Sequence, residues 1–158
     1  MKSLLLIFSI ALLVTVRSSA QPQQPATNPN YDPELAKRLG ANAVDMKTYV
    51  LCILKTGPKS AEITGKARED IFAGHFANIQ RLAGLGKLAI AGPFEKNDRS
   101  YGGLYIFNVP TIDEAEKLVV LDPAVKAGIF VPELTLWYGS AALMLVPEEH
   151  KKLQKPLH

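Results

Sequence analysis

The order of apolar segments along this chain limits the folds that it can adopt. Short apolar runs bounded by Gly and Pro, which are typical of strands, alternate with longer stretches of helical spacing. The pattern predicts strands at 49–54, 87–91, 104–109 and 134–137, the last continuing at 143–146 after an interruption at 138–140, and helices at 64–85 and 111–121. This order is that of an α+β, ferredoxin-like β-α-β-β-α-β sandwich with an antiparallel sheet.

Capping residues indicate where helical segments begin. Asp32-Pro33 favours a short helix over 33–39, since proline suits the first helical position. Thr111 and Glu114 form a capping box at the start of the later helix. Asp122-Pro123 ends that helix, because the residue before proline avoids the helical region, and Asp122 can also cap the turn that follows.

One face of the predicted sheet lacks a cover. In this fold both helices lie on the same side of the sheet, and the other side would leave apolar residues in water. In a chain as short as 158 residues, the economical cover is a second copy packed sheet against sheet. We therefore expect a homodimer.

The first 20 residues have the three parts of a secretory signal peptide. Lys2 gives a positive start, Leu4 to Val16 form an apolar run of 13 residues, and Ser18 and Ala20 suit a cleavage site. A bilayer span needs about 20 apolar residues. We expect cleavage after Ala20, export to the periplasm or the extracellular space, and no membrane attachment of the product. An uncleaved anchor is the alternative.

Composition divides the rest of the chain into three parts. Residues 21–45 are interpreted as a flexible segment with the short helix, 46–147 as the domain, and 148–158 as a C-terminal tail. Without the signal peptide, 16 basic residues stand against 15 acidic ones, and no basic cluster occurs in the domain. We therefore expect no nucleic-acid binding.

Neither a metal site nor a cofactor is expected. One histidine with scattered carboxylates does not supply the three or four convergent ligands that zinc requires. Gly84 and Gly86 follow a helix, whereas glycine loops that bind phosphate precede one. Cys52 is the sole cysteine, so no internal disulfide forms, and packing as a small hydrophobic residue explains it better than a reactive thiol.

His75 is the candidate for chemistry. It is the one histidine inside the predicted domain, and helical spacing places it on an apolar stripe with Ile71, Ile79 and Leu82. An imidazole has an unperturbed pKa of about 6.5 and exchanges protons near neutral pH. A histidine on such a stripe also serves as a plain core residue bonded to a carbonyl, so both roles stay open.

Three groups of residues form an ordered set along the domain. They are Leu54-Lys55-Thr56-Gly57-Pro58; His75, Ile79 and Leu82 with Gly86-Lys87-Leu88 and Ala91-Gly92-Pro93-Phe94; and Glu114-Ala115 with Asp122-Pro123-Ala124-Val125-Lys126-Ala127-Gly128 and Trp137-Tyr138-Gly139. This set resembles the YCII-related (YciI-like) domain family over about residues 47–146.

The resemblance implies a dimeric α+β barrel, in agreement with the element order. It also implies a site built on a His–Asp pair, here His75 and Asp122. A few relatives act on chlorinated hydroxyquinone-type compounds, and the wider barrel superfamily includes lactone isomerases and oxygenases. A cap explains Asp122 without chemistry, while a capping carboxylate keeps lone pairs for an imidazole, so both interpretations remain.

Five more side chains are candidates for substrate binding: Lys55, Arg68, Pro93, Phe94 and Trp137. The two cations could hold an anionic substrate near the helix entrance, or they are ordinary solvated charges. Pro93 follows a glycine and forms either a pocket lip or, more simply, a strand end. Trp137 either stacks on a ligand or lines the dimer interface, which we favour for a large aromatic residue.

Two hypotheses follow. In the first, the protein is an acid–base enzyme without cofactor, isomerase-like or lyase-like, that uses His75 and Asp122 on a small hydroxylated or cyclic substrate between the sheet and the first long helix. In the second, it is a non-catalytic dimeric module for small-molecule binding or structure, and His75 only satisfies a buried polar contact.

Overall fold

The structure is a computed structural model that describes residues 28–153 and 155. The chain divides into two compact units, Met1–Tyr31 and Asp32–His158, and of the first only residues 28–31 are described. The predicted signal peptide at 1–20 and the start of the flexible segment, 21–27, lie outside the described residues. Of the helices described, none has the length and apolar character to span a bilayer.

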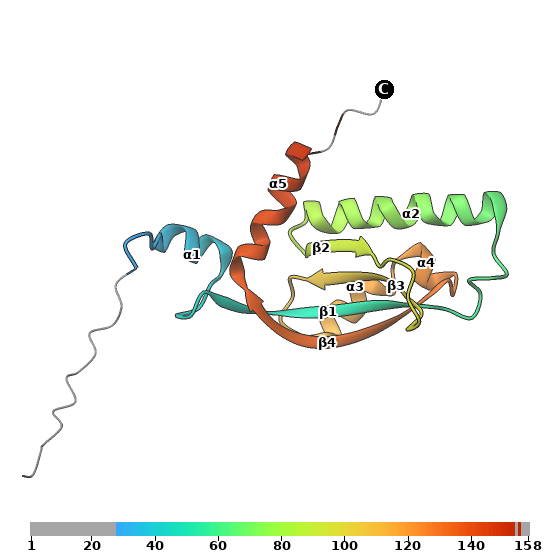
Figure 1. Ribbon diagram of the computed structural model, residues 1–158, viewed down its shortest axis with the longest axis horizontal. Helices are drawn as coiled ribbons and strands as arrows, with labels where there is room; N and C mark the ends of the chain where they lie inside the picture. The colour runs from blue at the N-terminus through green and yellow to red at the C-terminus, as the bar shows by residue number, and fades with distance from the viewer. Residues whose placement is uncertain (1–27, 154, 156–158) are drawn as a thin grey trace, which may run out of the picture. The chain divides into compact units, whose positions relative to one another are not determined.

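The second unit is built on a four-stranded antiparallel sheet. Its elements are α1 (Pro33–Leu39), β1 (Met46–Thr56), α2 (Gly65–Gly84), β2 (Leu88–Pro93), β3 (Tyr101–Phe107), α3 (Ile112–Val119), α4 (Pro123–Lys126), β4 (Phe130–Ser140), the 3-10 helix η1 (Ala141–Leu145) and α5 (Val146–Leu153) (Figure 1). The strand order across the sheet is β2-β3-β1-β4. The predicted α+β, ferredoxin-like class is confirmed, because β1-α2-β2-β3-α3-β4 follows that order.

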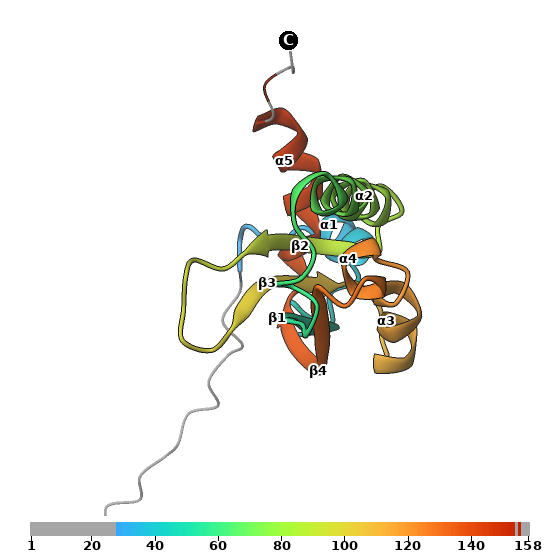
Figure 2. The same ribbon diagram turned by 90° about the vertical axis from the view of Figure 1, so that its right-hand side faces the viewer.

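The main core lies between the sheet and the helices. Side chains alternate along β1, so Val50, Cys52 and Leu54 all point toward the helices and are buried. They pack with Leu82 of α2 and Val119 of α3. Figures 1 and 2 show α2 running along β2 and α3 beside the β1–β4 side of the sheet. The helices therefore cover most of one face, although Leu136 at the outer strand β4 remains 52% exposed.

The opposite face, called the open face below, is covered only in part. A smaller cluster packs there against the apolar side chains of η1; it consists of Tyr49, Ala89 and Ile106 with Leu51, Ile90, Leu104, Leu143 and Met144. On the same face Ile53 is half-buried, and Trp137, opposite Tyr49 on the neighbouring strand, is 37% exposed. Apolar side chains thus remain in contact with solvent on this face.

Two of the predicted caps are present. Asp32 Oδ1 accepts a hydrogen bond from the Leu35 amide at 2.9 Å at the start of α1. Thr111 Oγ1 accepts one from the Glu114 amide at 3.2 Å at the start of α3. Each oxygen satisfies one of the amides that have no partner within the helix.

The C-terminal part differs from the prediction. β4 runs through 138–140 without interruption, and the strand predicted at 143–146 is wrong, because η1 and α5 occupy 141–153. A short apolar run does not distinguish a strand from a helix. A Cβ at Gly139 would lie 2.2 Å from the Trp137 ring. Glycine at this position of β4 therefore leaves room for the indole. Part of the predicted tail at 148–158 is the helix α5.

Candidate active site

His75 lies within α2, on the side of that helix that faces α4. The residue before it is Gly74, and a Cβ added there would lie 3.0 Å from Cγ of Pro123. The absent side chain lets α2 approach the start of α4 closely. His75 is buried at this contact, with 6% of its surface exposed.

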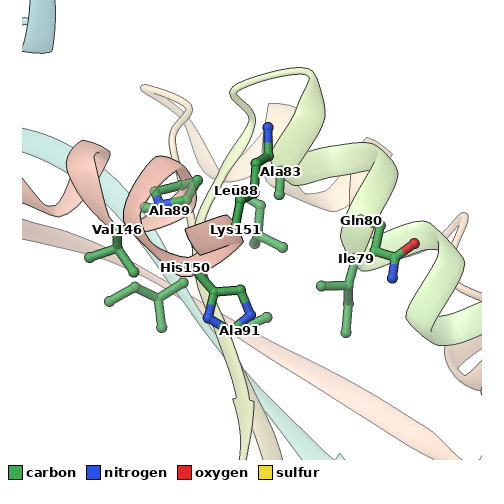
Figure 3. Close-up of a pocket in the computed structure, with 11 residues that line it drawn as sticks. Ile79, Gln80, Ala83, Leu88, Ala89, Ala91, Val146, His150 and Lys151 are labelled. Atoms are coloured by element: carbon green, nitrogen blue, oxygen red, sulfur yellow. The ribbon is translucent and has the colours of Figure 1, made fainter. Parts of the chain in front are cut away.

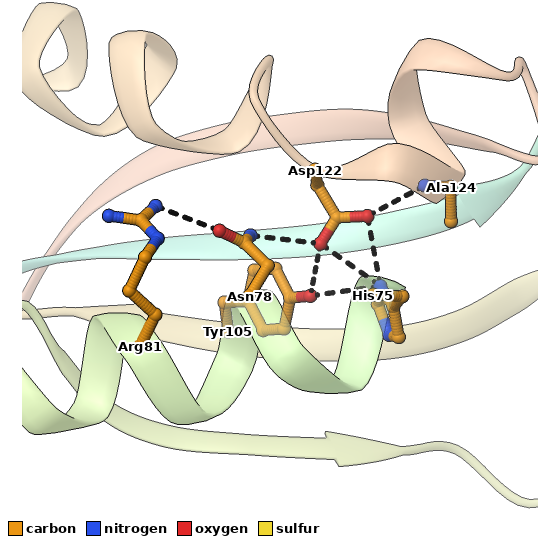
Figure 4. Close-up of polar contacts among 6 residues, drawn as sticks. All are labelled: His75, Asn78, Arg81, Tyr105, Asp122 and Ala124. Carbon is orange, nitrogen blue, oxygen red and sulfur yellow. Dashed lines mark hydrogen bonds and ion pairs between the residues drawn. The ribbon is translucent and has the colours of Figure 1, made fainter. Parts of the chain in front are cut away.

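The His75 ring contacts the carboxylate of Asp122 (Figure 4). Nδ1 lies 2.9 Å from Oδ1 and 3.0 Å from Oδ2. Asp122 Oδ1 also accepts a hydrogen bond from the Ala124 amide at 2.9 Å, which caps α4. The fully buried carboxylate therefore caps a helix and holds the imidazole at the same time, so its contacts satisfy both interpretations of the sequence.

Three more side chains, none of them a candidate from the sequence, complete the network. Tyr105 of β3 donates its hydroxyl to Asp122 Oδ2 at 2.9 Å and lies 3.2 Å from His75 Nδ1. Asn78 Nδ2 donates to the same Oδ2 at 3.2 Å, and Arg81 donates to Asn78 Oδ1 at 2.8 Å. Asn78 follows His75 by three residues, a spacing that places both on one helix face and that could have revealed it.

Asp122 is ionised inside the fold. Burial opposes its charged form, but the hydrogen bond and charge of His75, with the donors of Tyr105 and Ala124, bring the pKa of Asp122 below its ordinary value. Burial, followed by the charge of Asp122, raises the pKa of Tyr105, so its hydroxyl stays protonated and acts as a donor. An ionised carboxylate only accepts hydrogen bonds, and it therefore places the ring hydrogen of His75 on Nδ1.

The second ring nitrogen of His75, Nε2, takes no part in this network. Nε2 makes no hydrogen bond with the described residues, and no fully buried side-chain nitrogen or oxygen among them lacks a partner. Nε2 is therefore reached by solvent. With the hydrogen on Nδ1, Nε2 carries the lone pair that accepts a proton.

Aromatic rings surround the imidazole. The ring centroid of His75 lies 5.6 Å from that of Phe72, 5.4 Å from Phe76, 5.7 Å from Phe130 and 6.0 Å from Tyr105. Phe76 is 57% exposed, so this wall reaches the surface of the protein. The imidazole thus has a charged carboxylate on one side and apolar rings on the others.

A family model of the YCII-related domain matches residues 48–137, more than half of the chain. The chain belongs to the YCII-related domain family. Among solved structures it is similar to the 5-chloro-2-hydroxyhydroquinone dehydrochlorinase from Burkholderia phenoliruptrix AC1100, solved in complex with 2,5-dihydroxybenzoquinone. That likeness has 26% sequence identity and a TM-score of 0.41, and covers 56% of this chain and 90% of that one. The search of curated proteins found no match.

The YCII-related segment contains the whole His75 network, but it does not bring every candidate residue to it. Lys55 forms an ion pair with Glu133, and the Trp137 ring lies 5.8 Å from that of Tyr49. Strand alternation places these side chains on the open face, opposite the helices. Lys55 and Trp137 are therefore separated from His75 by the sheet.

Of the remaining candidates, Arg68 borders the site, whereas Pro93 and Phe94 have no described contact with His75. The Arg68 guanidinium lies 5.0 Å from the centroid of Phe72 and is held by two backbone carbonyls, so it borders the aromatic wall. Pro93 ends β2, and the Phe94 ring packs 5.6 Å from that of Tyr101. Neither Pro93 nor Phe94 has a hydrogen bond or ring contact with His75 among the described contacts.

A histidine that is held by a carboxylate through one ring nitrogen can accept a proton at the other. Among residues 28–153 and 155, no cluster of three His, Cys, Asp or Glu side chains is arranged to hold a metal ion. Cys52 lies in the core beneath the site, where burial and then the charge of Asp122 raise the pKa of its thiol to about 12. The thiol therefore stays protonated at neutral pH and is no nucleophile.

Proposed function

We propose that the protein is an exported enzyme that transfers protons on a small hydroxylated or cyclic compound without a cofactor, as an isomerase or a lyase. The observation that supports this most is that the two ring nitrogens of His75 have different surroundings. Nδ1 is bonded to the ionised Asp122, and Nε2 is open to solvent with its lone pair available. A general base needs one ring nitrogen held in place and the other free to meet the substrate.

The proposed reaction begins when Nε2 removes a proton from carbon or oxygen of the substrate. The imidazolium that forms is stabilised by the charge of Asp122 at 2.9 Å. If the proton returns to a different atom of the substrate, the product is an isomer. If the electron pair instead expels a leaving group, which departs as an anion, the product is that of an elimination and the proton leaves to solvent.

The aromatic wall favours a ring-shaped substrate. Phe76 stands beside the imidazole with a centroid distance of 5.4 Å and is largely exposed, so a planar ligand can stack on it while one edge meets Nε2. Arg68 lies next to this wall and is positively charged, which suits a hydroxylated ring that has lost a proton. These contacts support the substrate class and leave its identity to experiment.

Deuterium exchange tests the proposal without knowledge of the natural substrate. Hydroxyquinones and cyclic hydroxyketones would be incubated with the protein in heavy water, and NMR would follow exchange of carbon-bound protons and any isomerisation or elimination. The wild-type protein should accelerate one of these reactions. His75→Gln should reduce that rate by about 10²–10⁴-fold, the usual contribution of a general base.

The matched variants are Asp122→Asn, which keeps the shape but removes the charge, and Asp113→Asn on the first turn of α3, an exposed site. Asp122→Asn should lose most of the rate and Asp113→Asn none of it. Equal exchange rates for wild type and His75→Gln, with both folded, would contradict a catalytic His75.

A non-catalytic binding module is the second candidate, because Asp122 has four donors within the fold and a satisfied network needs no substrate. The two candidates differ in what His75→Ala changes. In a binding or structural module this variant lowers the melting temperature and no turnover exists to be lost. In an enzyme, turnover is lost in protein that still folds.

We also propose that the protein acts as a homodimer outside the cytoplasm. The partly covered open face supports a second copy packed sheet against sheet, since apolar side chains such as Ile53 and Trp137 remain accessible there. The signal-like pattern of residues 1–20 supports export to the periplasm or extracellular space. Mass spectrometry of the protein from its source should give a mature chain that begins at Gln21.

A further inference from the structure

A cavity of about 210 Å³ lies between the C-terminal half of α2, β2 and α5 (Figure 3). It is lined by Ile79, Gln80, Ala83, Leu88, Ala89, Ile90, Ala91, Val146, Pro147, His150 and Lys151. No member of the His75 network is among these residues. Four of them belong to α5, which lies beyond the family segment 48–137, so the cavity exists because the C-terminal helix packs on the YCII-related domain.

The interior of the cavity is apolar. Ile79 and Ala83 face it from α2, Leu88 and Ile90 from β2, and Val146 from α5. An engineered apolar cavity of about 150 Å³ holds benzene. A cavity of about 210 Å³ therefore accepts one ring, or a branched chain of similar size, with one small polar group attached.

The polar side chains that line the cavity carry donors and positive charge, and none is acidic. They are Gln80 of α2 and His150 and Lys151 of α5. Figure 3 shows the His150 ring and the Lys151 chain projecting from α5 toward β2 and the C-terminal part of α2. The neighbouring acid Glu149 is paired with Lys152, and Lys151 has no ion pair among those described. This charge distribution complements an anion.

We infer that the cavity is a second ligand site, which binds a small monocarboxylate with a compact apolar body, aromatic or branched aliphatic. The apolar body lies between Ile79, Leu88 and Val146. The carboxylate meets the ammonium of Lys151 at the rim, where charge-assisted hydrogen bonds are strong. Small-molecule sites have this composition, apolar walls with a few polar groups that set orientation.

The test uses benzoate and benzamide, which have nearly the same shape and differ in charge, with binding to the full chain measured by calorimetry and by NMR shifts of the lining residues. Benzoate should bind at least about tenfold more tightly than benzamide, the factor that corresponds to 1.4 kcal/mol. Lys151→Gln should remove that preference. Lys152→Gln is the matched control, since Lys152 is on the same helix, is paired with Glu149 and does not line the cavity, and it should change nothing.

Two further variants show where the probe binds. Ala83→Phe should fill the cavity and abolish binding of both probes, and Val146→Trp at the partly exposed rim does the same if Ala83→Phe does not fold. His75→Gln should leave benzoate binding unchanged, which separates this site from the proposed active site. The inference is overturned if benzoate fails to bind at millimolar concentration, if both probes bind equally, or if binding disappears in His75→Gln and persists in the filled variants.

Discussion

At the scale of single residues, Asp122 shows how a charge is kept inside this protein. Its carboxylate receives hydrogen bonds from His75, Asn78, Tyr105 and the Ala124 amide, which nearly fills the lone-pair sites that two oxygens offer. A buried ion without such partners would be strongly unfavourable. The same set of donors orients His75, so the stability of the charge and the geometry of the candidate base have one origin.

Tyr105→Phe should lower the free energy of unfolding by about 1.5–3 kcal/mol, because it removes a hydrogen bond to an ionised group. Tyr49→Phe is the matched control: its buried hydroxyl donates to the neutral backbone carbonyl of Ser140 at 3.0 Å, and its loss should cost about 0.5–1.5 kcal/mol. Urea denaturation at neutral pH measures both. Equal losses would mean that Tyr105 does not contact a charge.

Acid should lower the free energy of unfolding because it protonates Asp122. Its pKa is lowered in the folded state, so the unfolded state binds the proton more readily. The corresponding stability is present above the unfolded pKa, about 3.9, and is lost as the pH falls through the folded pKa. The stability difference between wild type and Asp122→Asn should therefore shrink as the pH is lowered from 6 toward about 3. Urea unfolding across this range checks it, and a constant difference would speak against an ionised Asp122.

At the scale of elements, the site depends on how closely α2 approaches α4. Gly74 permits the contact with Pro123, and the two helices bring His75 and Asp122 together although 47 positions separate them in sequence. Gly84, at the other end of α2, has no atom within 4 Å of an added Cβ. Packing therefore constrains Gly74 but not Gly84.

Gly84→Ala should raise the free energy of unfolding by about 0.4–1 kcal/mol, since alanine has fewer unfolded conformations and fits the open position. Gly74→Ala should gain less or lose stability, because its Cβ would stand 3.0 Å from Pro123 Cγ and push α4 away from α2. Thermal unfolding compares the two, and NMR of the His75 ring reports whether its contact with Asp122 persists. The same gain for both variants would exclude the packing constraint.

Sequence patterns predicted the elements that are long or capped. The apolar run at 49–54 and the helical stripe at 64–85 became β1 and α2 because burial on one or both faces leaves a regular pattern. The contact of His75 with Asp122 was expected from the family resemblance, whereas Tyr105 was missed. Its role depends on the register of β3 against β1, which places it opposite Cys52, and register is a property of the folded sheet.

At the scale of the whole molecule, the uneven cover of the sheet is the dominant feature. The helices cover most of one face, while η1 covers a smaller part of the other. Monomeric proteins seldom leave contiguous apolar area in water, so the open face favours association. The proposed active site is on the helix side, and association through the open face would leave Nε2 of His75 accessible.

Analytical ultracentrifugation at micromolar concentration should give the mass of a dimer. Ile53→Lys, on the open face beyond η1, should shift the protein toward monomer by burying an unpaired charge at the interface. Val120→Lys at an exposed position just after α3 is the control and should leave the mass unchanged. A monomeric wild-type mass would remove the support for a dimer.

Chemical modification of the single cysteine, Cys52, can report opening of the domain. Cys52 is fully buried between sheet and helices, and its thiol has a pKa of about 12. Thiol reagents react with thiolates, so the native protein should resist them until the helix layer separates from the sheet. Because the sequence has one cysteine, each modification event can be assigned to that separation without labels or engineered sites. The rate of modification thus reports global opening of the domain. The effects of ligands, variants and acid on that opening can be compared through this rate.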